Sequence, residues 1–247
     1  MSRTSKADIF AALQSDILRL QGFKPSSHIQ VDAGLGPLIE AFPNATFPLG
    51  AVHEFRFEKI EDSAATNGFL SGLLSNVIAE HGTILWISAT RTLFPPALKN
   101  YGLQPDRCIF IDLKNQKEVM WAMDEALKCG ALSAVVGEVN EIDFTASRRL
   151  QLAVEKSQVT GFIILPEEKK INTTACVSRW KITALPSTTI DDLPGIGIPK
   201  WKVELLRIRN GKPGVWELEL RKGKFEQSIN PSAETLKRNT ESIQQTA

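Results

Sequence analysis

Residues 84–87 read ILWI and residues 162–165 read FIIL, and these two runs of consecutive apolar side chains decide the fold class. A strand with one face in water alternates apolar and polar residues, whereas a strand covered on both faces is apolar throughout. Two shorter runs of the same kind, IFI and AVV, occupy residues 109–111 and 134–136. Such strands are typical of a parallel sheet, because helical crossovers cover both of its faces.

Alternating strand and helix patterns extend on both sides of these runs. The sequence predicts strands at residues 51–57, 83–88, 108–112, 133–136 and 161–165. Apolar spacing predicts helices between them at residues 66–80, 116–128 and 145–156, the second beginning at the cap pair Asn115 and Glu118. We therefore expect an α/β core with a mainly parallel sheet flanked by helices on both sides.

The helical pattern stops after residue 165. Further strands are expected at residues 175–184, 200–209 and 214–221, and Asn210-Gly211 between two alternating runs is a strong hairpin signal. The sheet should therefore end in an antiparallel hairpin. We expect the core to span residues 51–225 and residues 226–247, which have few core-forming side chains, to be a disordered tail.

The chain begins with a predicted helix inside residues 1–22, followed by a linker rich in proline and glycine over residues 23–50 that holds one short helix near residues 36–42. One apolar stripe of the first helix is formed by Ile9, Leu13, Ile17 and Leu20. That stripe needs a partner, either the chain's own core or another protomer or protein.

Composition sets outer limits on the class of protein. The 247 residues include 29 Lys and Arg against 28 Asp and Glu, with 43% hydrophobic residues, which is enough for one large globular domain. No apolar run approaches the ~20 residues that span a bilayer, and the first residues lack a signal-peptide pattern, so we expect a cytoplasmic protein. The three cysteines, Cys108, Cys129 and Cys176, have neither disulfide nor metal spacing and are expected to be buried reduced thiols.

Residues 57–66, FEKIEDSAAT, lie where an ATPase core of this layout would carry its phosphate-binding loop. That loop requires GxxxxGK[ST], because glycines let backbone N–H groups converge on phosphate, lysine neutralises it and the hydroxyl holds Mg²⁺. The stretch has no glycine, its lysine comes too early, and three carboxylates repel a triphosphate. We predict no nucleotide cofactor and a degenerate site made of Glu58, Lys59, Glu61, Asp62 and Thr66.

Other catalytic patterns are weak. His28, His53 and His81 lack metal-ligand spacing and are expected at the surface or in packing roles, and no GxSxG occurs. Glu138 and Asp143 follow a strand, where they would either face a ligand or cap the next helix.

Five stretches together resemble one protein family: FPLGAVHEF, ILWISATRTLFPPALKNYGLQPDRCIFID, EVMWAMDEALKCGALSAVVGEV, TASRRLQLAVEKSQVTGFIIL and WKVELLRIRNGKPGVWELEL. Over roughly residues 36–220 they are similar to the ImuA family, RecA-like proteins of bacterial damage-inducible mutagenesis cassettes. The resemblance implies a RecA-type fold and an accessory role in translesion synthesis. It also implies an ImuB-type polymerase-like protein and an error-prone replicative-type DNA polymerase as partners, with RecA as a further partner.

The sequence departs in three places from the RecA pattern that the resemblance implies. The phosphate loop is replaced as described; Gly137 stands where a Mg²⁺-linked Asp is expected; and Thr90, or Arg91 in the neighbouring register, stands where a water-activating Glu is expected. The resemblance with these losses implies a protein without ATPase activity.

RecA-like proteins hold DNA with loops after the fourth and fifth strands, here residues 140–147 and 166–174. The first loop is acidic, and in the second Lys169 and Lys170 are offset by Glu167 and Glu168. Residues 178–225 carry ten basic and five acidic side chains, so if the protein contacts DNA, the better placed cations are Arg179, Lys181, Arg207, Arg209 and Lys212. Cations on an edge hairpin also serve as solubility devices, and that alternative stays open.

The pair Arg148-Arg149 heads a predicted helix, where it would either clamp a partner's carboxylate or pair with Glu155 or Asp143. The sequence hypothesis is a non-catalytic adaptor of the SOS-type damage response. The alternatives are a SulA-like cell-division inhibitor and a weak ATP-dependent DNA-binding protein.

Overall fold

The computed structural model describes residues 34–78, 81–90, 93–167, 172–188 and 197–228. Within them the strands form one nine-stranded sheet in the order β3-β2-β4-β5-β1-β6-β7-β8-β9. The strands are β1 (Val52–Phe57), β2 (Ile84–Ser88), β3 (Cys108–Asp112), β4 (Ala134–Glu138), β5 (Thr160–Pro166), β6 (Ser178–Thr188), β7 (Ile198–Ile208), β8 (Gly214–Arg221) and β9 (Lys224–Gln227). Strands β3 to β6 in that order pair parallel, and β6 to β9 pair antiparallel. The predicted fold class is therefore confirmed.

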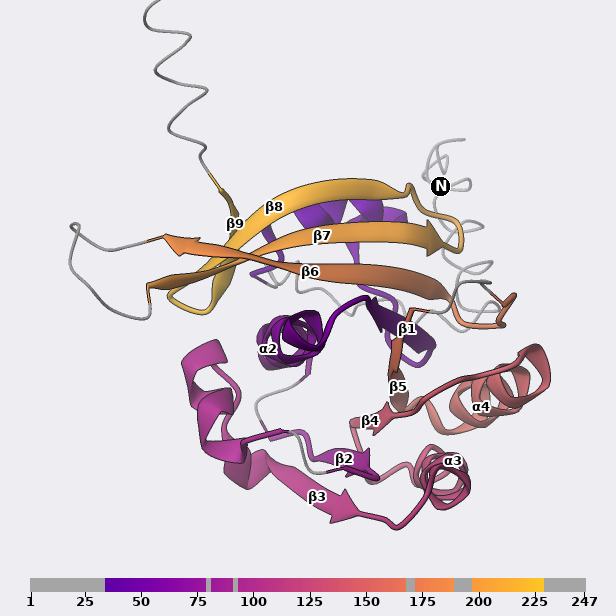
Figure 1. The fold of residues 1–247 in the computed structure, drawn as a ribbon. Coiled ribbons are helices and arrows are strands. Elements are labelled where there is room, and N and C mark those ends of the chain that lie inside the picture. The colour runs from indigo at the N-terminus through magenta and orange to yellow at the C-terminus, as the bar shows by residue number, and fades with distance from the viewer. Residues whose placement is uncertain (1–33, 79–80, 91–92, 168–171, 189–196, 229–247) are drawn as a thin grey trace, which may run out of the picture.

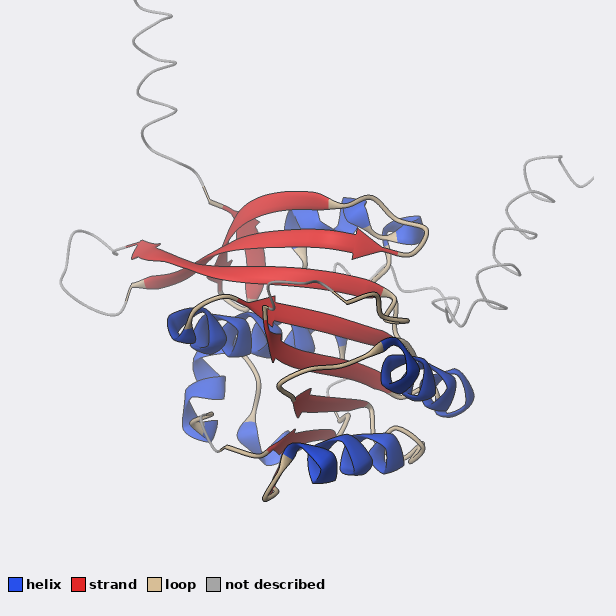
Figure 2. Cartoon of the chain, turned by 45° about the vertical axis from the view of Figure 1, so that its right-hand side comes forward, coloured by secondary structure: helices blue, strands red, loops and turns tan. Residues whose placement is uncertain are grey.

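Helices cover both faces of the parallel part (Figure 1). Helix α2 (Ile60–Val77) lies on one face, and α3 (Gln116–Ala126) and α4 (Phe144–Ser157) lie on the other (Figure 2). Asn115 caps α3 by accepting from the Glu118 N–H at 3.0 Å, as the sequence predicted. Short 3₁₀ turns complete the described elements: η1 (Gly36–Ala41), η2 (Pro43–Ala45), η3 (Pro95–Tyr101) and η4 (Pro105–Arg107).

The sheet separates two hydrophobic cores, because successive side chains of each strand point to opposite faces. On β1, Val52 packs into the core beneath α3 and α4, whereas Phe55 packs into the core around α2. The antiparallel extension curves over α2, so that Phe69 of this helix meets the rings of Trp201 and Phe225 at centroid distances of 5.8 and 4.9 Å. Helix α2 is thereby enclosed between the two halves of the sheet.

Helix α2 differs from the prediction in where it begins. The sequence pattern predicted a loop through residues 57–66 and a helix from residue 66, but the helix starts at Ile60. Only Glu58 and Lys59 connect it to β1. The acidic stretch that was interpreted as a loop is the first turn of the helix, where carboxylates are favourable.

Both ends of the described core also differ from the prediction. Residues 34–50, expected within a linker, pack on the α2 side through buried Leu35, Leu38, Phe42 and Phe47. A ninth strand, β9, extends past the predicted end of the core, and its Phe225 is 1% exposed. The Phe225 N–H donates to the Gly34 carbonyl at 2.6 Å, which joins the first described residue to the last strand.

The predicted first helix and most of the predicted tail lie outside the described residues. So do Ile9, Leu13, Ile17, Leu20 and His28.

Candidate functional site

The N-terminus of α2 is the place where a phosphate would bind in an ATPase of this layout. Here the carboxylate of Asp62, from the first turn of the helix, lies beside this helix end. Its Oδ2 accepts from the Lys59 N–H at 3.2 Å, and its Oδ1 accepts from the Ala184 N–H of β6 at 2.8 Å. Asp62 is 4% exposed. A negative charge of the chain therefore lies at this helix end and ties it to the extension of the sheet.

The other residues of the predicted degenerate site lie around this helix end. Glu58 is exposed and its Oε2 lies 3.0 Å from Lys181 Nζ, while Lys59 and Glu61 are exposed. Thr66 is buried within α2, and its hydroxyl donates to the Asp62 carbonyl at 2.6 Å. This hydroxyl is engaged inside the helix.

The two remaining positions of the predicted site lie on other strands. Thr90 follows β2 and is exposed, and its alternative Arg91 lies outside the described residues. Gly137 faces α3, since a Cβ added there would lie 1.9 Å from the Met123 sulfur. Its neighbour Glu138 lies on the α2 side of β4 and accepts from the Trp86 indole N–H at 2.8 Å. The carboxylate of β4 that faces the α2 side is therefore at position 138.

Asp143 and Glu138 take different roles. Asp143 caps α4 by accepting from the Ala146 N–H at 2.7 Å, as one of its two sequence interpretations predicted. The Glu138 carboxylate accepts from the indole N–H of Trp86 on the neighbouring strand.

A buried charged cluster on β1 was missed from the sequence. Glu54 and Arg56, 0% and 1% exposed, are two residues apart and so point to the same face of the strand. Glu54 binds Arg56, accepts from Arg179 Nε at 3.0 Å, and accepts from the Thr174 hydroxyl at 2.6 Å. The available signal was the position of two charged residues inside a strand expected to be covered on both faces.

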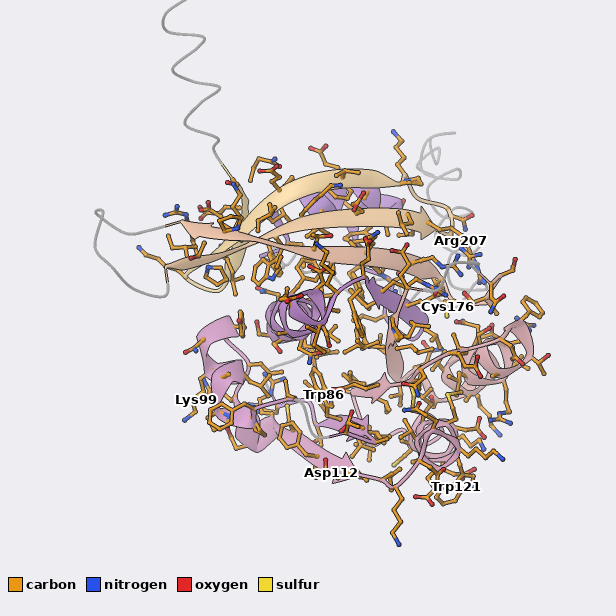
Figure 3. All side chains as sticks on the ribbon, viewed as in Figure 1. Trp86, Lys99, Asp112, Trp121, Cys176 and Arg207 are labelled. Atoms are coloured by element: carbon orange, nitrogen blue, oxygen red, sulfur yellow. The ribbon has the colours of Figure 1, made fainter. Side chains whose placement is uncertain are left out.

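Two of the predicted DNA-binding arginines hold the segment that leads into β6. Arg179 donates to the Asn172 carbonyl at 2.7 Å, and Arg207 donates to the carbonyls of Thr174 and Cys176. Arg207 and Cys176 lie together at the end of the sheet extension (Figure 3). These arginines therefore bind the chain's own backbone in this structure.

The other predicted DNA-binding cations differ in their surroundings. Lys181 binds Glu167 and Glu58, and these two carboxylates, Glu167 above all, raise the pKa of its ammonium group. Arg209 and Lys212 lie at the β7–β8 turn and make no side-chain ion pair within the described part of the chain. Lys169 and Lys170 lie outside the described residues.

Arg148 and Arg149 of α4, the two arginines predicted to bind a partner protein, each make an ion pair within the chain. Arg148 lies 3.9 Å from Glu155, which was one of its predicted partners. Arg149 lies 3.4 Å from Asp124 of α3, which was not predicted.

Two of the three cysteines are buried, as predicted, and the third is exposed. Burial raises the pKa of Cys108 to about 11 and that of Cys176 to about 12. Cys129, expected to be buried, is exposed at the end of α3. In the described ranges no group of three His, Cys, Asp or Glu side chains is placed to hold a metal ion.

His53 fills the packing role that its spacing predicted. Its Nε2–H donates to the Pro48 carbonyl at 2.7 Å, so Nδ1 accepts from the Ser178 hydroxyl at 2.7 Å. Ser178 in turn accepts from the Trp180 indole at 2.7 Å. Burial lowers the pKa of His53 to about 4, so the ring is neutral at pH 7.

The strand order, the helix that directly follows β1 and the antiparallel extension define a RecA-like protein. The solved structure of the RadB recombinase has the same fold: it covers 81% of this chain and 100% of its own with a TM-score of 0.55 at 14% sequence identity. The chain belongs to the ImuA family, since it is 33% identical to Protein ImuA of Caulobacter vibrioides over 190 residues, 72% of this chain and 78% of that protein.

A shorter similarity links the chain to another protein. The cell division inhibitor SulA of Photorhabdus laumondii is 30% identical over 124 residues, 50% of this chain and 70% of SulA. No protein-family model matches the chain. Of the helices that the structure describes, none combines the length and the apolar character needed to cross a membrane.

Proposed function

We propose that this protein is a non-catalytic RecA-like adaptor of the DNA damage response that acts in error-prone translesion synthesis. Membership of the ImuA family supports the link to damage-inducible mutagenesis. The adaptor works by binding other proteins and hydrolyses no ATP. Its partners are an ImuB-type polymerase-like protein, an error-prone replicative-type DNA polymerase and RecA.

One observation carries the proposal: the Asp62 carboxylate sits on the N-terminus of α2. A helix N-terminus attracts an anion, and here the anion is supplied by the chain. A phosphate bound at this helix end would lie close to the Asp62 carboxylate, and like charges so close repel strongly. The two-residue connection before the helix leaves no loop for a phosphate cradle.

The adaptor role is tested by reconstituting the complex from purified full-length proteins with and without ATP and Mg²⁺. We expect the polymerase-like partner to bind the chain with the same affinity in both buffers. A complex that forms only with ATP, or that dissociates as ATP is hydrolysed by this chain, would contradict the proposal. A RecA-type ATPase in parallel shows that the nucleotide and metal are active.

The role of the first residues is tested separately. A variant lacking residues 1–22 should lose one partner, because the stripe formed by Ile9, Leu13, Ile17 and Leu20 would then be missing. An unchanged set of partners would remove this segment from the proposal.

A second candidate function is inhibition of cell division, which the similarity to SulA favours. Under this alternative a tubulin-like division protein co-purifies with the chain in place of the polymerase-like protein. The same capture experiment therefore distinguishes the two functions.

A further inference from the structure

Strand β3 forms one outer edge of the sheet (Figure 1). Within the described residues no strand pairs with its open side. The opposite edge differs, because the Phe225 N–H of β9 donates to the Gly34 carbonyl at 2.6 Å. An open edge presents unpaired backbone N–H and C=O groups, which can pair with a strand of another molecule. The β3 edge is therefore a candidate interaction surface.

The side chains of β3 do not protect this edge. Natural edge strands are guarded by lysine, proline or a bulge, but Ile109, Phe110 and Ile111 form the centre of β3. The pairing of β3 with β2 runs without a register shift. Ile109 is 51% exposed, and Phe110 and Ile111 are only half-buried. A further strand would cover these side chains and pair the backbone, and both effects stabilise a sheet.

The hydrogen bonds between β2 and β3 fix which backbone groups face the open side. The Leu113 N–H donates to the Ser88 carbonyl of β2 at 2.9 Å. Because the backbone groups of successive strand residues point to alternate sides, those of Ile109 and Ile111 also point to β2. The N–H and C=O of Phe110 then point outward, at the middle of the five-residue strand.

The sequence around Phe110 is complementary to itself in an antiparallel pairing. When two copies of β3 pair about a two-fold axis at Phe110, Ile109 of one copy lies opposite Ile111 of the other. Asp106 comes opposite Lys114, and the axis repeats both pairs. Neither of these two side chains makes an ion pair within the described part of the chain. Apolar side chains thus meet apolar ones and opposite charges meet, so a second copy fits this edge.

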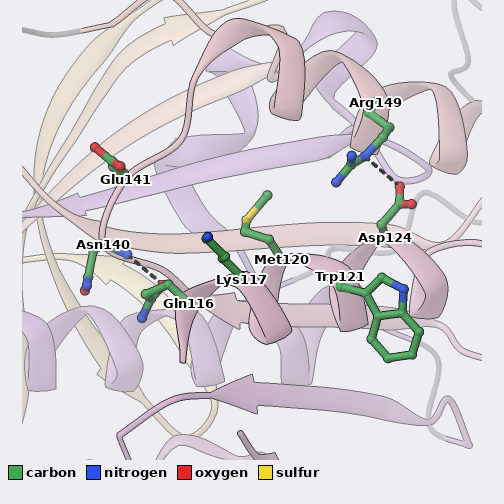
Figure 4. Close-up of a pocket in the computed structure, with 8 residues that line it drawn as sticks. All are labelled: Gln116, Lys117, Met120, Trp121, Asp124, Asn140, Glu141 and Arg149. Atoms are coloured by element: carbon green, nitrogen blue, oxygen red, sulfur yellow. Dashed lines mark hydrogen bonds and ion pairs between the residues drawn. The ribbon is translucent and has the colours of Figure 1, made fainter. Parts of the chain in front are cut away.

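The groove between α3 and α4 has no such complementarity (Figure 4). Trp121 beside it is 66% exposed, but the groove is lined by two cations and two carboxylates. Arg149 lies 3.4 Å from Asp124 there, so its charge is matched within the chain. The groove therefore favours no particular occupant, whereas the β3 edge matches a copy of itself.

We propose that two copies of this chain pair through their β3 strands and join their sheets across a two-fold axis. The Phe110 N–H of each copy donates to the Phe110 carbonyl of the other. Ile109 packs against Ile111 on the face of the sheet that carries α3, and Lys114 binds Asp106 on both sides of the axis. This self-association goes beyond the adaptor function and does not depend on it.

Sedimentation velocity of the full-length chain, without nucleotide or partner proteins, measures self-association. We expect a monomer–dimer equilibrium with a dissociation constant in the micromolar range, since a strand pair buries less surface than a standard interface. Ile109→Lys should weaken the dimer at least about tenfold, because an ammonium group then lies at the paired edge of each copy. The Ile109 side chain is half exposed, so the variant should fold, which circular dichroism checks.

The matched control is Val215→Lys, at a position of β8 that is 60% exposed and far from β3 in the strand order. It adds the same charge to the chain and should change the dissociation constant by less than about twofold.

Charge reversal tests the register of the pair. Lys114→Glu and Asp106→Lys should each weaken the dimer at least about fivefold, because each places like charges opposite one another on both sides of the axis. A mixture of the two variants should form a heterodimer with about the wild-type affinity, because opposite charges then face each other again. A fluorescent label on one variant makes the heterodimer visible in the same sedimentation experiment.

Hydrogen exchange tests the backbone pairing. The Phe110 N–H should exchange more slowly as the protein concentration rises, because the second copy then accepts its hydrogen bond. The N–H groups of Ile109 and Ile111, which point to β2, should stay protected at every concentration.

Several outcomes would overturn the proposal: a chain that stays monomeric, assemblies that grow beyond a dimer, a dimer that Ile109→Lys leaves unchanged, or charge variants that do not associate when mixed. Protection of Phe110 that is independent of concentration and is lost when residues 1–33 are removed would also overturn it, because this chain would then cover its own edge. If the dimer fails while the nucleotide-independent complex still forms, the adaptor function stands. If the complex requires ATP while the dimer still forms, the adaptor function falls and the dimer stands.

Discussion

At the scale of single residues, Glu54 balances the charge buried inside the sheet. It is fully buried, and it is the carboxylate that Arg56 and Arg179 share. Removing one member of a buried ion pair leaves an uncompensated charge, which costs far more than the pair itself contributes. The cluster also anchors Thr174, and with it the segment before β6.

The first prediction is that Glu54→Gln lowers the free energy of unfolding by about 3 to 5 kcal/mol. Urea denaturation followed by circular dichroism measures the change. The exposed Glu61→Gln serves as a control and should stay within about 0.5 kcal/mol of the wild type. A loss below about 1 kcal/mol for Glu54→Gln would show that the cluster is not held by this carboxylate.

Because burial lowers the pKa of His53, we predict that the free energy of unfolding depends on pH. Its folded pKa of about 4 lies below the ordinary value of 6.5, so between these pH values the unfolded chain binds the proton and the folded chain does not. The stability contributed by the neutral ring is therefore fully present above pH 6.5 and is lost as pH falls toward 4. The loss across that window is about 3 kcal/mol.

Unfolding free energies measured by urea denaturation between pH 7.5 and pH 4.5 test this assignment. The slope of the unfolding free energy against pH should be smaller in His53→Gln, because the imidazole no longer contributes to it. This holds whatever the absolute stability of the variant. Equal slopes for the two chains would rule out His53 as the titrating group.

At the scale of elements, the start of α2 depends on Asp62, which joins the helix to β6. We predict that Asp62→Ala costs about 1 to 3 kcal/mol, because two backbone N–H groups lose their acceptor. Asp62→Asn should cost less, since one side-chain oxygen remains. Hydrogen exchange at Ala184 gives a local readout and should speed up in the alanine variant. If Ala184 stays as protected as in the wild type, the link between α2 and β6 is not real.

The elements show which sequence signals carried information. The parallel strands were predictable because short continuous apolar runs such as ILWI, bounded by turn residues, are typical of strands covered on both faces. The start of α2 was not, because three acidic residues near a strand end are equally typical of a loop and of a helix's first turn. Strand β9 was missed because KFEQ holds one apolar residue, and only packing against α2 reveals the role of Phe225.

Only part of the candidate site could be predicted from the sequence. The absence of GxxxxGK[ST] could be read directly from FEKIEDSAAT, and the degenerate nucleotide site inferred from it stays a prediction. The positions of Arg179 and Arg207 could not, because a cation in a strand is usually exposed and the carbonyls that they bind lie in a segment without regular structure. The side of the sheet that Glu138 faces depends on strand register, and a shift of one residue reverses it.

At the scale of the whole molecule, the chain has a RecA-like fold, and the carboxylate of Asp62 lies at the start of α2. Under the proposed adaptor function its surfaces are the means of action, and the basic β7–β8 turn with Arg209 and Lys212 is one of them. The link that Asp62 makes between α2 and β6 suits the proposed adaptor, whose binding we expect to be independent of ATP.

The most direct measurement of this claim is a calorimetric titration of the full-length chain with ATP and Mg²⁺. We predict no binding heat and no release of phosphate, because the Asp62 carboxylate lies at the helix end where a phosphate would bind and would repel it. Binding in the micromolar range together with turnover would contradict the account.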